Sequence, residues 1–171
     1  MREGAQALHK LEITGSVRSE RINSLLQYWR QKCAGRIMPS KRDIDPAELK
    51  PLLPHLMLAE IHEAPLRVRY RLVGTEAVRM AREDYTGRWL TETGWEAEEI
   101  ASYLRQYTAL VASRSPQLGT GHLISEDGKE RIFEWGKFPL SDDGEHVTHC
   151  IGIEEMIPIR AMALARAPGQ H

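Results

Sequence analysis

Hydrophobic positions recur with the period of an α-helix in two long segments of the chain. In residues 19–33 the apolar side chains fall on one face, and Ser16 or Ser19 can cap the helix. The residues of this face are Ile22, Leu25, Leu26, Trp29 and Cys33. Residues 96–113 carry a second continuous stripe, preceded by glutamates that favour a helix N-terminus. The first stripe must be buried either on its own domain or on a second copy of the chain.

Alternating apolar and polar positions predict five strands. In residues 67–74 the alternation is strict, so Val68, Tyr70 and Leu72 share one face and three arginines share the other. The five segments expected as strands are 56–62, 67–74, 118–125, 131–140 and 147–153. Asp127-Gly128 is a strong hairpin signal between the third and the fourth. The order is helix, two strands, helices and three strands, which predicts an α+β fold with a five-stranded antiparallel sheet.

The segment between the first helix and the first strand has its own local signals. Asp45 is predicted to cap a short helix that begins at Pro46, with Glu48 completing a capping box. Pro51 and Pro54 then end this helix, because proline has no N–H to donate and clashes with the preceding turn.

Several short motifs follow one another in the first half of the chain. They are Tyr28-Trp29-Arg30, Gly35-Arg36, Met38-Pro39-Ser40, Asp43-Ile44-Asp45-Pro46, Leu52-Leu53-Pro54-His55-Leu56, Tyr70-Arg71-Leu72-Val73-Gly74-Thr75 and Tyr85-Thr86-Gly87-Arg88. Together they resemble a bacterial family of stand-alone PAS-like domains, common in alphaproteobacteria and formerly a domain of unknown function. The resemblance covers residues 22–155. It implies a PAS-like five-stranded antiparallel sheet with helices inserted after strand two and a flanking N-terminal helix, and a sensor or ligand-binding role.

Length and composition bound the organisation of the protein. A chain of 171 residues is long enough for one core of ordinary size. We expect a flexible N-terminal arm over 1–18, one domain over 19–157 and a C-terminal tail over 158–171. Charged residues make up 27% of the chain and the formal net charge is −1, so no nucleic-acid or membrane partner is expected. With no apolar run of membrane-spanning length and no signal peptide, we expect a cytoplasmic protein.

A helix laid across a concave antiparallel sheet encloses either a ligand site or a filled core. The side chains expected to face this space, and to bind a small organic ligand, are Tyr70, Leu72, Tyr103, Tyr107, Leu110, Trp135 and His149. Trp135 faces the space in only one of two phases of its strand. His149 alternates with Val147 and Ile151, and is either a satisfied core residue or a pocket group that offers a hydrogen bond or ligates haem.

No catalytic, cofactor-binding or metal-binding residues are predicted. Neither cysteine lies in a recognisable local signature, and no serine lies in a G-x-S-x-G turn. His55 and His62 are seven residues apart in one strand region, which places them on opposite faces. The arginines at 67, 69 and 71 either bind an anion or nucleic acid, or form a solvated face paired with acids such as Glu60 or Glu63 across the hairpin.

These observations favour a PAS-like sensory or regulatory module without catalysis. It would bind a small ligand, a protein partner or both, and would act as a stand-alone regulator, with a homodimer through the N-terminal helix as a further expectation. One alternative is a small cone-shaped α+β enzyme, an isomerase or hydrolase that uses a buried acid or His149. Another is a dimeric adaptor with a filled core and no ligand.

Overall fold

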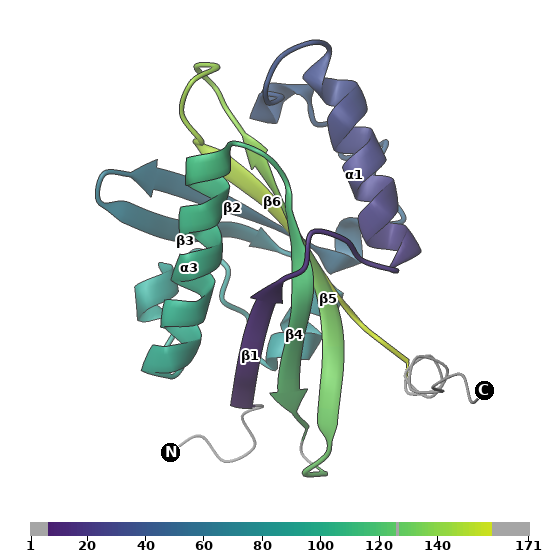
Figure 1. The fold of residues 1–171 in the computed structure, drawn as a ribbon, viewed down its shortest axis with the longest axis vertical. Helices are drawn as coiled ribbons and strands as arrows, with labels where there is room; N and C mark the ends of the chain where they lie inside the picture. The colour runs from purple at the N-terminus through teal and green to yellow at the C-terminus, as the bar shows by residue number, and fades with distance from the viewer. Residues whose placement is uncertain (1–6, 126, 159–171) are drawn as a thin grey trace, which may run out of the picture.

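The centre of the protein is a six-stranded antiparallel sheet with the strand order β1-β4-β5-β6-β2-β3 (Figure 1). The computed structural model describes residues 7–125 and 127–158. The strands are β1 (Ala7–Ile13), β2 (Leu56–Glu63), β3 (Leu66–Val73), β4 (Gln117–Ile124), β5 (Glu130–Leu140) and β6 (His149–Met156). The helices are α1 (Glu20–Cys33), α2 (Thr75–Ala81) and α3 (Ala97–Ser113), with 3-10 turns at Lys41–Asp43, Leu53–His55 and Leu90–Glu92.

The five predicted strands and the helices between the second and third of them are confirmed. The sheet has one strand more than predicted, because β1 lies in the segment expected to be a flexible arm. It pairs antiparallel with β4, with Leu11 opposite Gly121 and Ile13 opposite Gly119. The prediction of a loose arm is therefore wrong for residues 7–13. The rest of the predicted arm before residue 7, and the predicted tail from residue 159, lie outside the described residues.

Two glycines of β4 make room for aromatic rings from β5. A Cβ atom at Gly119 would lie 2.5 Å from the Trp135 ring and 1.9 Å from the carbonyl oxygen of Glu12, and one at Gly121 would lie 2.2 Å from the Phe133 ring. These positions are opposite each other in the β4–β5 ladder. The Gly119-Thr120-Gly121 segment is thus a strand whose missing side chains permit close packing.

Helices α1 and α3 cover opposite faces of the sheet, as the alternation of β5 shows. A Cβ atom at Gly136 would meet Ile22 of α1, whereas the next residue, Lys137, lies against Tyr103 and Tyr107 of α3. Figure 1 shows the two helices on either side of the strands. Because successive side chains of a strand point to opposite faces, β5 contacts both helices along its length.

The apolar stripe of α1 packs on its own domain. Ile22, Leu25, Leu26 and Trp29 are all buried, and the Trp29 indole donates a hydrogen bond to the carbonyl of Pro139 at 2.7 Å. Ser19 caps the helix by accepting from the Ile22 amide. The helix therefore uses its stripe within the fold, and a homodimer through α1 would have to use its other face.

The segment after α1 differs from the prediction. Residues 46–51 form successive turns and not a helix, although the Asp45 side chain accepts a hydrogen bond from the Ala47 amide at 2.9 Å. The capping box lies earlier, at Ser40 and Asp43. Glu48 instead accepts a hydrogen bond from the Tyr28 hydroxyl and pairs with Lys32, so it ties this segment to α1. Pro51 and Pro54 leave too few residues for a stable helix.

Candidate functional site

A cluster of polar and aromatic side chains lies between α3 and the sheet. Tyr103 and Tyr107 come from α3, Tyr70 from β3, and Trp135 and Lys137 from β5. Each of these residues is buried, with 8% of Tyr103 and no more than 1% of the others exposed. The predicted ligand-binding residues Tyr70, Tyr103, Tyr107 and Trp135 thus share one interior with a lysine that was not predicted.

Three aromatic rings surround the Lys137 ammonium group. Its Nζ lies 5.2 Å from the ring centre of Tyr103, 5.0 Å from that of Tyr107 and 5.1 Å from that of Trp135. Such distances allow a cation to interact favourably with the faces of aromatic rings. Within the described residues, no carboxylate oxygen lies within 4.0 Å of this nitrogen. Burial lowers the pKa of Lys137, because the charged form loses its hydration.

Glu154 of β6 is the acidic neighbour of this lysine. It lies opposite Trp135 in the β5–β6 ladder, and the Tyr103 hydroxyl approaches its Oε1 at 3.4 Å. Burial raises the pKa of Glu154, and the Lys137 charge opposes this effect. Burial also raises the pKa of the Cys150 thiol to about 12. The cluster therefore contains one cationic and one acidic side chain that are both costly to keep charged.

Two neighbouring side chains of α3 have polar atoms without a hydrogen-bond partner in the described part of the chain. They are the Tyr107 hydroxyl and both polar atoms of the Gln106 amide. Gln106 is 3% exposed and Tyr107 is fully buried. Burial is the main cause of the raised pKa values of Tyr70 and Tyr107. A loose contact between the two hydroxyls lowers the pKa of Tyr70 and raises that of Tyr107, but it does not meet the geometry of a hydrogen bond. A buried polar group without a partner costs about 1–3 kcal/mol, which is why such groups indicate a missing partner.

A series of ring contacts extends this interior. Tyr70 lies edge to face against Tyr85 at 4.6 Å, Tyr85 against Trp95 at 5.0 Å, and Trp95 lies 5.3 Å from Tyr103. Leu110, one further turn along α3 from Tyr107, is fully buried. The walls of the site are therefore largely aromatic, with few polar tips.

Leu72 does not belong to this interior. Its side chain is 63% exposed, although it was predicted to share a face with Val68 and Tyr70. The register between β2 and β3 shifts, so that Leu58 pairs with Leu72 while the next residue, Ala59, pairs with Tyr70. The extra residue, Arg71, forms a bulge, which reverses the alternation after Tyr70. Arg71 pairs with Glu60 across the hairpin, which confirms that arginine as part of a paired, solvated face.

His149 lies on the other face of the sheet. It does share the face of Ile151, as predicted, but Ile151 pairs with Phe138, which packs beside α1. The imidazole Nδ1 is 3.1 Å from the Thr148 hydroxyl and 3.6 Å from Asp142. Burial lowers the pKa of His149. The expectation that His149 joins the tyrosines is therefore wrong. Both faces of β6 are covered, so the alternation of its residues does not show which face lies under α3.

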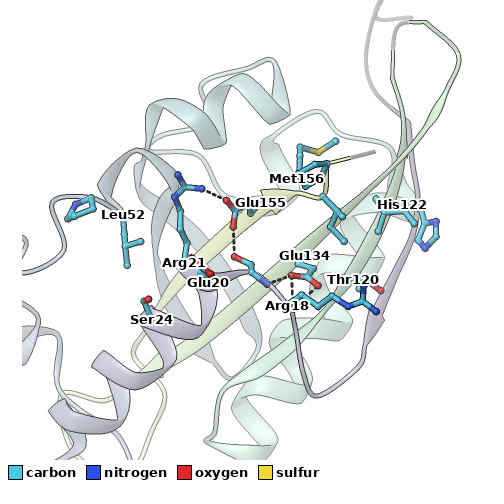
Figure 2. Close-up of a pocket in the computed structure, with 15 residues that line it drawn as sticks. Arg18, Glu20, Arg21, Ser24, Leu52, Thr120, His122, Glu134, Glu155 and Met156 are labelled. Atoms are coloured by element: carbon cyan, nitrogen blue, oxygen red, sulfur yellow. Dashed lines mark hydrogen bonds and ion pairs between the residues drawn. The ribbon is translucent and has the colours of Figure 1, made fainter. Parts of the chain in front are cut away.

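A pocket of about 920 Å³ lies beside the N-terminus of α1 (Figure 2). The buried Glu134 carboxylate accepts hydrogen bonds from the Arg18 amide at 2.9 Å and the Ser19 amide at 2.6 Å. Glu155 accepts from the Ser19 hydroxyl and pairs with Arg21. The positive end of the α1 dipole stabilises both carboxylates. Their partners are already within the chain, so these contacts hold α1 against β5 and β6.

The sequence analysis missed the charged residues of both regions. Lys137 stands alone as a charge within Trp135-Gly136-Lys137-Phe138-Pro139-Leu140, and this isolation in an apolar run was the available signal. Glu154 gave a weaker signal, because it lies in β6 after Cys150-Ile151-Gly152-Ile153 but is followed directly by Glu155. Glu134 gave no such signal, because its partners are backbone amides of a distant loop.

The fold and the sequence together identify the family. A family model described as a PAS domain matches residues 17–153, and the chain belongs to this family. The match spans α1, five strands of the sheet and both helices between β3 and β4. A search of curated protein sequences gives no significant match. None of the described helices is long and apolar enough to cross a membrane.

Proposed function

We propose that this PAS domain is a sensory module that binds a small organic ligand between α3 and the sheet and regulates a protein partner. PAS domains are typically sensory modules without catalytic activity, and the family membership supports this class of function. One observation carries the proposal of a ligand. Lys137, Tyr107 and Gln106 are almost fully buried. The Tyr107 hydroxyl and the Gln106 amide lack hydrogen-bond partners among the described residues, and the Lys137 ammonium has no carboxylate partner there within 4.0 Å. A ligand would provide those partners.

Strands β5 and β6 connect this site to α1. Trp135 of β5 lies opposite Glu154 of β6, and both are on the side of the sheet that α3 covers. The adjacent pair of the same ladder, Glu134 and Glu155, is on the side that α1 covers. A ligand that displaces the Trp135–Glu154 pair would therefore move the two carboxylates that hold the start of α1. We infer that α1 and the adjoining pocket are the surface that changes when the ligand binds.

Native mass spectrometry of protein purified from cells tests the proposal. A sensor should carry, or take up from a library of small acids, amines and neutral aromatic compounds, one ligand per chain. Ligand binding should change amide hydrogen exchange in α1 as well as in α3. A protein that binds nothing from cells or from this library would contradict the sensory function. Binding without any change in α1 would refute the output route alone.

A small enzyme is the second candidate, and Glu154 is the observation that favours it. A half-buried carboxyl group with a raised pKa beside a tyrosine hydroxyl suits proton transfer. An enzyme would convert the bound compound into a product, and Glu154→Gln would stop conversion while binding continued. A bound compound that remains chemically unchanged would exclude this candidate for that compound.

A further inference from the structure

We propose that the ligand is a small aromatic carboxylate whose negative group is bound by Lys137. This inference rests on the proposed sensory function, since it defines the chemical class that the same site would accept. Its starting point is the ammonium group that β5 directs at α3. That group is surrounded by three rings and has no ion-pair partner within 4.0 Å among the described residues.

The charge of the site favours an anion. An ammonium group removed from water needs a counter-charge, and the rings supply only part of the stabilisation. Glu154 is the acidic group that acts on Lys137, but it lies beyond ion-pair distance and its own burial favours the neutral form. The Cys150 thiol also stays neutral, with a pKa of about 12. A ligand that brings its own negative charge would complete the neutralisation.

The hydrogen-bonding groups of the site favour a ligand with oxygen atoms. An ammonium group has three N–H donors, the Tyr107 hydroxyl has one donor, and the Gln106 amide has two donors and an acceptor. These groups come from β5 and from consecutive positions on α3. A carboxylate has two oxygens that accept several hydrogen bonds, so it can satisfy Lys137 and Tyr107 together.

The surroundings of these groups favour an aromatic body. Trp135 and Tyr103 flank Lys137, and the ring series continues through Trp95 and Tyr85 to Tyr70. Offset and edge-to-face contacts between rings add to the gain from burying apolar surface. A ligand with an aromatic ring next to its carboxylate matches both parts of the cluster, whereas a small inorganic anion would leave the aromatic walls unused.

Calorimetric titration with three acids and their amides tests this inference. The probes are benzoate, phenylacetate and 4-hydroxybenzoate, each compared with the neutral amide of the same shape. We expect at least one acid to bind about ten- to a hundredfold more tightly than its amide, the range expected for a charge-assisted hydrogen bond. Lys137→Met should remove this preference, and Tyr107→Phe should weaken binding of the acid.

Lys129→Met is the matched control, because Lys129 is an exposed lysine near the start of β5. This variant should bind the acids as the wild type does, and circular dichroism should show that every variant is folded. Failure of all three acids, or equal binding by Lys137→Met, would overturn the inference. If amides or other neutral compounds bind in a Tyr107-dependent way while the acids do not, the ligand class is wrong and the sensory function stands. If no compound binds and none co-purifies, both are wrong.

Discussion

The ammonium group of Lys137 lies 5.0 Å from the centre of the Tyr107 ring, so the sheet and α3 meet at a charge–aromatic contact in the interior. An apolar residue would fill this position at lower cost, because a buried ammonium loses its hydration. The Tyr107 hydroxyl in the same contact also lacks a hydrogen bond within the described residues. The interior is therefore less stable than a filled apolar core would be, and this is typical of a site built for function rather than for stability.

Removing the charges of buried Lys137 and half-buried Glu154 should stabilise the protein without ligand. The double variant Lys137→Met/Glu154→Gln replaces a cation and an acid that do not form a close ion pair. We expect the free energy of unfolding to rise by about 1–4 kcal/mol, as seen when buried charges give way to neutral groups. Urea denaturation measures this. The exposed control Lys129→Met/Glu130→Gln should change stability by less than about 0.5 kcal/mol. A loss of stability in the first variant would show that the charges support the fold.

The sequence predicted the PAS-type order of helices and strands because each element has a clear period or turn signal. The apolar stripe of α1 and the strict alternation of β3 are examples. The additional strand β1 could not be predicted in this way. Its pairing depends on Gly119 and Gly121 of β4, which lie more than a hundred residues later in the chain. A strand defined by a distant edge carries little local signal.

The candidate site was predicted only in part. The alternation of residues along a strand shows which side chains share a face of the sheet, but not which helix covers that face. Tyr103, Tyr107 and Trp135 do share an interior, but His149 lies on the α1 face. Both faces of β6 are covered by helices, so a residue's partners depend on packing that no local pattern records. The bulge at Arg71, which exposes Leu72, likewise arises from the register of two strands.

The turn after α1 should depend on Asp43. Its carboxylate accepts a hydrogen bond from the Ser40 amide at 2.7 Å and pairs with Arg36, and the Ser40 contact is the main cause of its lowered pKa. Asp43→Ala should cost about 1 kcal/mol, the usual loss for a cap. The difference from the wild type, measured by chemical denaturation, should shrink as the pH falls below 3.8, because the carboxyl group of the wild type is then protonated. A neutral result at pH 7 would contradict the capping role.

Because β4 packs closely against β1, a single added methyl group in β4 should lower the stability of the protein. At Gly119 a new Cβ atom would lie 1.9 Å from the Glu12 carbonyl oxygen, which belongs to the backbone and cannot move alone. Gly119→Ala should therefore destabilise the protein by about 1–3 kcal/mol or detach β1. Gly152→Ala is the control, since its nearest neighbour is the flexible Met57 side chain at 2.7 Å. Equal losses in thermal unfolding would show that β1 adjusts easily.

The Glu134 carboxylate should be the main attachment of the start of α1. It is 5% exposed and accepts from the Arg18 and Ser19 amides. Glu134→Ala leaves these amides without their acceptor, so we expect a loss of about 1.5–3 kcal/mol in urea denaturation. Glu130→Ala on the same strand removes an exposed partner of His122 and should cost much less. Similar losses for both variants would mean that water replaces the Glu134 carboxylate.

Stability should depend on pH through Glu154, and the variant Lys137→Met isolates this effect. Burial raises the pKa of Glu154 in the folded chain above its ordinary value of 4.5. At a pH between 4.5 and the raised pKa, the folded chain therefore keeps a proton that the unfolded chain has lost. The free energy of unfolding then falls as the pH rises through this window. As the pH rises above 4.5, Lys137→Met should therefore lose stability relative to Lys137→Met/Glu154→Gln, since all other titrating groups are common to both. Urea denaturation at a series of pH values gives the two curves. Parallel curves would show that Glu154 titrates in the folded protein as it does in the unfolded chain, and the charge argument for an acidic ligand would then lose its support from Glu154.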